Sequence, residues 1–505
     1  MKFERASGVL LHPTCLPGPH GCGDLGQQAH RFVDWLAAAG QRLWQVLPIG
    51  EVGLGNSPYM SPSSFAGNVL LIDLHRLLAE GWLPAEQLHP EPGLHETRVD
   101  YPRVRAFRMH RLRQASACFF TLPHDPRHEE YARFCEAERS WLDDYALFMA
   151  LAHDAQWRPW NEWDAALARR EPSALHRAVQ DRHEPIRFWK FCQWNFRRQW
   201  NELRAHAHRR GVRIIGDLPI FPALHSAEVW ANQSLFELDA HGHPTVIAGV
   251  PPDYFSATGQ RWGNPLYRWS EHERRGYDWW IERLRALIAL VDIVRIDHFR
   301  GFAAHWEIPA SEHTAVNGHW CPGPGARLFD ALTAALGRLP VIAEDLGVVT
   351  DDVVELRRRF ELPGMHVLQF AFAGDARNPH LPHRCTPDAV IYTGTHDNDT
   401  AVGWWHSASP RERRFASLYL GTDGHEIHWD LIRAASSSVA AFSVAPMQDV
   451  LGLDGAHRLN RPGAATGCWE WRLSWSQVQS DHGERLAGLS AIHDRSDIGH
   501  AALDR

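Results

Sequence analysis

The sequence lacks several features that would assign it to a common class of protein. It has no Cys-x-x-Cys pair, and its eight cysteines are scattered, so we expect reduced, packing cysteines rather than a disulfide framework or a cysteine-rich zinc site. It has no block of like charges, and the formal charge is only −8, which argues against nucleic acid or an anionic membrane as the main partner. The first apolar run, GVLL, is far too short for a signal peptide or a membrane span. We therefore expect a cytoplasmic protein.

Eight short apolar runs are the main pattern that is present. Each ends near a polar residue and a glycine or proline, which is typical of strands that are buried on both faces of a parallel sheet. Helical patterns follow several of the runs, so the order of elements predicts an α/β protein with a (β/α)8 TIM barrel. The runs are GVLLHP, RLWQVLP, RIIGDLP, DIVRIDHF, PVIAEDLG, MHVLQFAF, AVIYTGTHD and FSVAPMQD.

The spacing of the runs predicts where the barrel is interrupted. Residues 75–210 are charged, aromatic and helix-like, so we expect one or two mostly helical inserted subdomains there, with residues 1–74 and 211–505 forming the barrel. The segment near 245–270 is rich in proline, glycine and aromatic residues without periodicity, which predicts a structured loop over the barrel mouth. Only about fifty residues follow the eighth run, too few for a C-terminal β domain.

Carboxylates stand at the ends of four runs: Asp217, Asp297, Glu344 and Asp397. The C-terminal ends of barrel strands meet at one mouth, where barrel enzymes build their sites, so we expect these groups to converge. A single carboxylate at a strand end more often caps a helix or forms a structural ion pair. Several together repel one another and are costly unless they are used. Two carboxylates at a barrel mouth suit glycoside chemistry, in which one attacks the anomeric carbon and the other protonates the leaving oxygen.

The run DIVRIDHF places charged side chains inside an otherwise apolar strand. Alternation along a strand puts Arg295 and Asp297 on one face, and Ile296 and His298 on the other. A cation within about 4–6 Å lowers the pKa of a carboxylate. We therefore expect Arg295 to keep Asp297 ionised, as a nucleophile requires.

Longer motifs resemble a known family. SPY and AGN, GQRWGNPLY, VRIDHFRG, IAEDLG and THDNDT occur in this order and closely resemble the 4-α-glucanotransferases called amylomaltases or disproportionating enzymes, glycoside hydrolase family 77. The resemblance covers most of the chain, from SGVLLHPTCLPGPHGCGDLG to PMQDVLGL and RLNRPG. It implies a transglycosylase that moves an α-1,4-glucan segment to the 4-OH of another glucan or of glucose by a retaining double displacement. α-1,4-Glucans and maltooligosaccharides are then its partners, and the resemblance implies no cofactor and names no protein partner.

The resemblance also implies roles for individual residues. Asp297 is the expected nucleophile, Glu344 the general acid and base, and Asp397 the group that stabilises the transition state. The expected binding and orienting residues are Arg295, His396, Asp217, His298, Tyr59, Trp262, Tyr254, Phe255 and Asn264. Three departures from the family segment after SPY are expected to alter the subsites near Tyr59: Met60, Pro62 and Val69.

Two alternatives stay open from the sequence. An α-1,4-glucan hydrolase of the same clan would differ in its acceptor, although such relatives usually carry a C-terminal β domain. A non-catalytic α-glucan-binding protein would not need a costly carboxylate cluster beside Arg295. We expect no metal site, because the HGH stretch at 241–243 contains Gly242 and is followed by Pro244, which is typical of a turn.

Overall fold

The computed structural model describes residues 3–123, 125–252, 256–464 and 466–496. Its centre is an eight-stranded parallel sheet in the spatial order β10-β11-β12-β1-β2-β3-β6-β9. The N–H of Ala343 donates to the C=O of Pro363 at 2.8 Å, which joins the two outer strands and closes the barrel. The strands are β1 (Ala6–Leu10), β2 (Leu43–Gln45), β3 (Arg213–Leu218), β6 (Ile293–Ile296), β9 (Val341–Ala343), β10 (Gly364–Val367), β11 (Ala389–Tyr392) and β12 (Phe442–Pro446). Each predicted run supplies one strand, so the predicted TIM barrel is confirmed.

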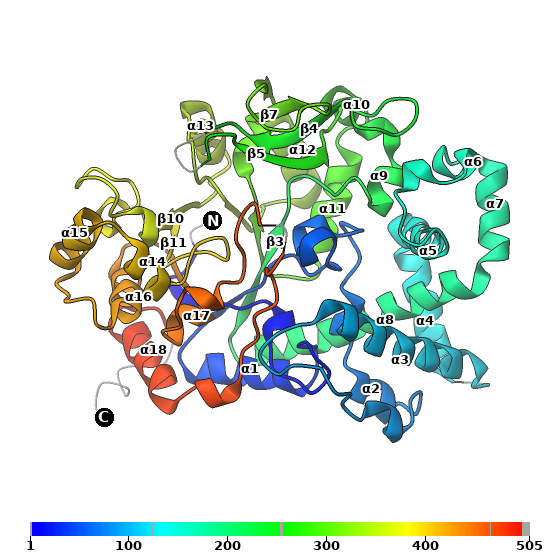
Figure 1. Cartoon of the computed structure of the whole chain (residues 1–505), viewed down its shortest axis with the longest axis horizontal. Coiled ribbons are helices and arrows are strands. Elements are labelled where there is room, and N and C mark those ends of the chain that lie inside the picture. Colours follow the sequence, from blue (N-terminus) through cyan, green and yellow to red (C-terminus); the bar gives the residue numbers. More distant parts are fainter. Residues whose placement is uncertain (1–2, 124, 253–255, 465, 497–505) are drawn as a thin grey trace.

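Helices surround the barrel (Figure 1). Inside it, apolar side chains from neighbouring strands form one buried cluster that includes Leu43, Ile215, Ile293 and Ile342, which explains why these strands are apolar on both faces. Among the residues described after β12 there is no further strand. The helices around the barrel are α1 (Gln27–Ala38), α11 (Asp278–Ile288), α12 (Ala326–Leu336), α13 (Asp351–Arg359), α14 (Ala401–Ser407), α15 (Pro410–Leu420), α16 (Ile427–Ser437), α17 (Met447–Val450) and α18 (Ser480–Ile492).

Between β2 and β3 the described chain is helical, and these helices extend to the right of the barrel in Figure 1. Helix α8 packs both on α1 and on α3, α4 and α5, so it links the barrel to the inserted helices. The division into a barrel and an inserted helical subdomain therefore stays a prediction. The helices are α2 (Leu74–Ala79), α3 (Tyr101–Thr121), α4 (Arg127–Ala137), α5 (Arg139–Asp154), α6 (Ala165–Ala168), α7 (Pro172–Asp181) and α8 (His183–Arg209).

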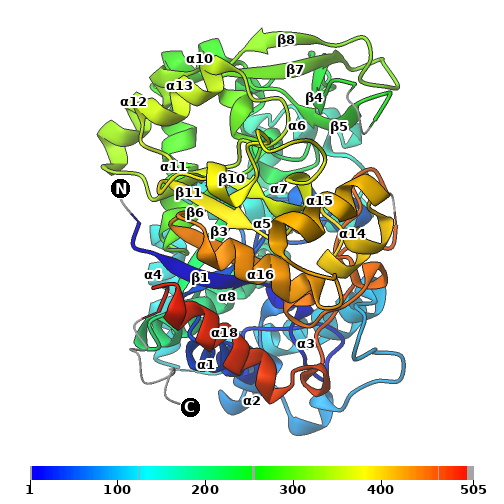
Figure 2. The same cartoon turned by 90° about the vertical axis from the view of Figure 1, so that its left-hand side faces the viewer.

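A second, antiparallel sheet lies at the top of the molecule in Figure 2, with the order β5-β4-β7-β8. Its strands are β4 (Val246–Val250), β5 (Gln260–Pro265), β7 (Ala304–Pro309) and β8 (His319–Pro322), and two short helices, α9 (Ala227–Ala231) and α10 (Trp269–Arg274), lie nearby in the chain. The segment predicted as a loop over the mouth thus contains two of these strands. No helix among the described residues is long and apolar enough to cross a membrane.

Candidate active site

Strand register brings the two predicted catalytic carboxylates to the same level of the barrel mouth. Strands β6 and β9 pair in parallel, with Ile296 opposite Ala343, and Asp297 and Glu344 are the next residues of these chains. The N–H of Glu344 donates to the C=O of Ile296 at 3.0 Å, and the N–H of Asp297 donates to the C=O of Leu218 at 3.0 Å. These hydrogen bonds hold the backbone of Asp297 and of Glu344 against the ends of neighbouring strands.

Arg295 connects two carboxylates. It lies directly opposite Asp217 in the pairing of β3 with β6, and its Nη1 donates to both oxygens of Asp217, at 2.8 and 2.7 Å. The same Nη1 lies 3.0 Å from Oδ1 of Asp297. The side chain of Arg295 is 4% exposed and that of Asp217 is fully buried, so this positive charge acts within the protein rather than in solvent.

The carboxylate of Glu344 is held by two backbone donors. The N–H of His298 donates to Oε2 at 2.6 Å, and the N–H of Leu346 donates to Oε1 at 3.0 Å. His298 adopts a left-handed conformation with φ 50° and ψ 47°, which is costly for a residue other than glycine. The strand alternation expected to reach His298 stops before it, because β6 ends at Ile296 and the chain turns there.

The cluster alters the acidity of its members. Burial raises the pKa of Asp297 well above its usual value; Arg295 opposes this, and the charges of Asp217, Glu344 and Asp397 add to it. Burial also raises the pKa of Glu344, against the effects of Arg295 and of its backbone donors. Arg295 favours the ionised form of Asp297, but burial outweighs it, so the pKa of Asp297 is raised and not lowered as the sequence predicted. Buried carboxylates in this state retain a proton readily, which a general acid requires.

Asp397 and His396 lie in the loop that follows β11. The Asp397 side chain is 44% exposed, and Nε2 of His396 lies 3.3 Å from its Oδ2. Nδ2 of Asn460 donates to Oδ1 of Asp397 at 2.6 Å, and Nη2 of Arg458 donates to its C=O at 2.7 Å. Because the charge of Asp397 acts on Asp297, this loop belongs to the same mouth.

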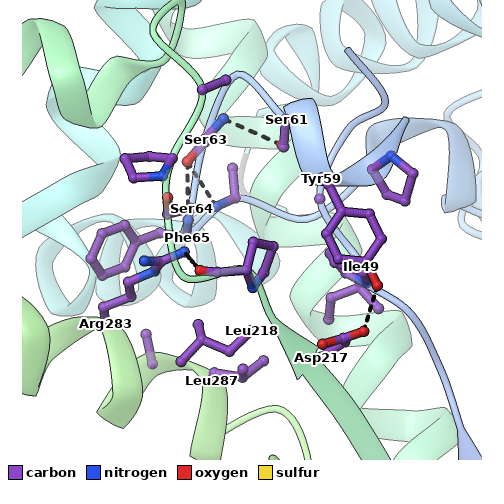
Figure 3. Close-up of a pocket in the computed structure, with 18 of the residues that line it drawn as sticks. Ile49, Tyr59, Ser61, Ser63, Ser64, Phe65, Asp217, Leu218, Arg283 and Leu287 are labelled. Atoms are coloured by element: carbon purple, nitrogen blue, oxygen red, sulfur yellow. Dashed lines mark hydrogen bonds between the residues drawn. The ribbon is translucent and has the colours of Figure 1, made fainter. Parts of the chain in front are cut away.

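Tyr59 connects the ion pair of Arg295 and Asp217 to the loop that carries His396. Its hydroxyl donates to Oδ2 of Asp217 at 2.6 Å, at one end of a pocket that Leu218, Leu287 and neighbouring residues line (Figure 3). Its ring stacks on His396 with centroids 5.3 Å apart and an interplanar angle of 12°. Trp469 lies 5.8 Å from the Tyr59 ring and 5.6 Å from the His396 ring. The three rings form an aromatic wall beside the carboxylates.

Comparisons with known proteins decide the family. Residues 11–478 match the family model described as 4-α-glucanotransferase, glycoside hydrolase family 77. The chain belongs to this family. The 4-α-glucanotransferase of Thermus thermophilus is 49% identical over 503 residues, which cover 98% of this chain and 100% of that protein; that of Synechocystis is 48% identical over 499 residues, with 98% and 99% covered. A solved structure of the Streptococcus agalactiae amylomaltase in complex with acarbose matches with a TM-score of 0.95 at 36% identity, covering 98% of this chain and 100% of that one.

The predicted family and its 4-α-glucanotransferase activity are thereby confirmed. In this glucanotransferase, Trp262 on β5 reaches the mouth, where its ring meets the His298 ring edge-on with centroids 4.8 Å apart. Asn264 is 6% exposed, and its Nδ2 donates to the C=O of Pro222 at 3.0 Å, so its contacts tie β5 to the segment after β3. The binding role of Asn264 stays a prediction. Two further predicted residues, Tyr254 and Phe255, lie outside the described residues.

The structure adds residues to the predicted set. Asn460 and Arg458 hold Asp397, and both stand in RLNRPG, which carried part of the family resemblance without suggesting a role. Trp469 had no local signal at all, because its position against Tyr59 depends on packing between segments far apart in the chain. The HGH stretch is a turn, as predicted, in which Oδ1 of Asp239 accepts from two backbone N–H groups.

Proposed function

We propose that this glucanotransferase uses Asp297 as the nucleophile and Glu344 as the general acid and base. The observation that carries this proposal is the pairing of Ile296 with Ala343, which places the two carboxylates side by side at the ends of β6 and β9. Arg295, 3.0 Å from Asp297, stabilises the ionised nucleophile. The backbone donors on Glu344 fix its carboxyl group beside the nucleophile.

The reaction takes two displacements. An Asp297 oxygen attacks the anomeric carbon of an α-1,4-linked unit; the bond to the leaving oxygen breaks, and Glu344 gives its proton to that oxygen. Glu344, now a carboxylate, then takes the proton of the acceptor 4-OH, whose oxygen attacks the anomeric carbon and releases Asp297. Two inversions leave the α configuration unchanged.

The surrounding residues bind and order the sugar. The exposed oxygen surface of Asp397, fixed by Asn460, is suited to grip hydroxyl groups as positive charge develops on the ring. The stacked rings of Tyr59 and His396 offer a flat wall beside it. Trp262 meets His298 edge-on and limits the access of water, which favours a sugar acceptor and strengthens electrostatic interactions in the site.

The proposed substrates are α-1,4-glucans and maltooligosaccharides, and the proposed location is the cytoplasm. The family, together with the amylomaltase structure that contains acarbose, supports the substrate class. Eight free cysteines support a reducing compartment.

The test is incubation of the purified protein with maltotriose, following both the product ladder and the total reducing ends. Transfer conserves reducing ends, whereas hydrolysis creates them. We expect glucose and a ladder of longer oligosaccharides at constant reducing ends. Rising reducing ends without longer products would identify a hydrolase, and an unchanged substrate that still binds would identify a binding protein.

A further inference from the structure

The hairpin formed by β7 and β8 gathers four metal-binding side chains outside the carboxylate site. Its antiparallel register places His305 opposite Cys321 and Glu307 opposite His319. Residues two apart on a strand share a face, and so do residues directly opposite each other. All four side chains therefore leave the same face of the hairpin, which lies at the top of the molecule in Figure 2.

The donor atoms of three of these residues are close together. One ligand atom each from His305, Glu307 and Cys321 lies within 4.8 Å of the other two, and Nε2 of His319 lies 3.5 Å from Oε1 of Glu307. With zinc bonds of about 2.0–2.3 Å, tetrahedral ligands stand roughly 3.3–3.7 Å apart. Small side-chain rotations would close the difference.

His305 has a buried ring nitrogen that is free to bind a metal ion. The residue is 5% exposed, and its Nδ1 is buried without a hydrogen-bond partner among the described residues. Burial lowers the pKa of His305 to about 4, so the ring is neutral at pH 7. A neutral imidazole nitrogen without a partner is costly in the interior and is a good metal ligand.

Cys321 supplies a soft donor beside a carboxylate. Burial, together with the charge and hydrogen bond of Glu307, raises the pKa of Cys321 to about 11, so the metal-free thiol is protonated. A divalent zinc-type ion replaces that proton, which passes to solvent as the sulfur–metal bond forms. A set of one thiolate, imidazole and one carboxylate suits zinc and not magnesium or calcium, which prefer oxygen ligands alone.

We propose that His305, Glu307 and Cys321 form a zinc-type metal site, with His319 as the fourth ligand. Its expected effect is structural, because the metal would cross-link β7 to β8 in the sheet whose β5 carries Trp262. No pattern in the sequence predicts a metal at this hairpin. The ligands have no recognisable spacing, and only the antiparallel register brings the two segments together.

The test uses the full-length protein after treatment with a chelator and its removal. Cobalt(II) is added first, because a cysteine thiolate ligand produces a near-ultraviolet charge-transfer band, and zinc is then titrated against a chromophoric chelator. The variants are Cys321→Ser, His305→Gln and His319→Ala. Cys118→Ser, a partly buried cysteine in α3, is the matched control.

We expect one zinc per chain and a thiolate–cobalt band in the unmodified protein and in Cys118→Ser. Cys321→Ser should lose the band, and loss of either Cys321 or His305 should weaken zinc binding by about 100-fold or more, since even outer ligand partners are worth about 10–100-fold. His319→Ala should weaken it less. Zinc should also raise the melting temperature of the unmodified protein and not of Cys321→Ser. Absence of the band, or zinc binding by Cys321→Ser as tight as in the control, would overturn the proposal; melting temperatures in chelator show whether each variant is folded.

Discussion

The Nη1 atom of Arg295 lies 3.0 Å from Oδ1 of Asp297, and it also donates to both oxygens of Asp217. The buried guanidinium is therefore divided between Asp297, the proposed nucleophile, and a neighbouring carboxylate. This arrangement follows from register, because β3 and β6 place Asp217 directly opposite Arg295. Changes at either partner should act on the acidity of Asp297.

The first prediction concerns pH dependence. The charge of Asp217 raises the pKa of Asp297, whereas Arg295 lowers it. As the proposed nucleophile, Asp297 must be ionised to attack, so activity should fall as the pH drops through its pKa. Asp217→Asn should move the acidic limb of the kcat/KM profile to lower pH, and Arg295→Met should move it to higher pH. Profiles of kcat/KM against pH with maltotriose check this. A shift of the acidic limb in the same direction in both variants would contradict the sharing of Arg295 between Asp217 and Asp297.

The second prediction separates the two catalytic roles. Asp297→Asn should reduce turnover by about 10⁴-fold or more, while calorimetry still detects maltooligosaccharide binding. Glu344→Gln should be comparably poor with maltotriose but should react with a maltosyl fluoride, because fluoride leaves without a proton. A covalent intermediate in mass spectra of that variant is the expected result. Full activity of Asp297→Asn would remove the nucleophile assignment.

The third prediction concerns Asn460. Its amide donates to Oδ1 of Asp397 at 2.6 Å, and hydrogen bonds to charged groups contribute about 1.5–3 kcal/mol. Asn460→Ala should therefore lower kcat/KM by about 10–100-fold. Its melting temperature should stay near that of the unmodified protein, because Asp397 can turn to solvent. A large loss of stability without a specific loss of activity would indicate a structural role instead.

The fourth prediction concerns the choice of acceptor. The Trp262 ring meets the His298 ring edge-on at 4.8 Å, and Trp262→Ala would open this side of the site to water. We expect the ratio of reducing ends released to transfer products formed to rise several-fold, while bond cleavage continues. Trp320→Ala, on β8 at the opposite edge of the same sheet and 39% exposed, serves as a comparison. An unchanged ratio in Trp262→Ala would show that this ring does not exclude water.

Local patterns in the sequence were enough to predict the barrel and its carboxylates. A buried parallel strand is apolar on both faces, so each run could be recognised alone, and Asp297 and Glu344 stand directly after such runs. The second sheet was not predicted, because Gly249, Gly263 and a register shift in β4 break the alternation that identifies a strand. Contacts between distant segments, such as Trp469 on Tyr59, leave no local pattern to read.

The fifth prediction concerns Asp449, a buried residue that holds the loop carrying Asp397. Its oxygens accept from the Thr393 hydroxyl at 2.6 Å and from the N–H of Ala401 at 2.7 Å, and burial raises its pKa from 3.8 to about 6. Because the pKa of Asp449 is higher in the folded state than in the unfolded state, its contribution to stability is fully present below pH 3.8. The free energy of unfolding then falls by about 3 kcal/mol as the pH rises through the folded-state pKa. Asp449→Asn keeps both hydrogen bonds, since Thr393 can accept from the amide, but cannot ionise. Relative to the unmodified protein, the variant should therefore gain stability between pH 4 and pH 7 in urea unfolding. A stability difference that does not change with pH would show that Asp449 is not ionising in this range.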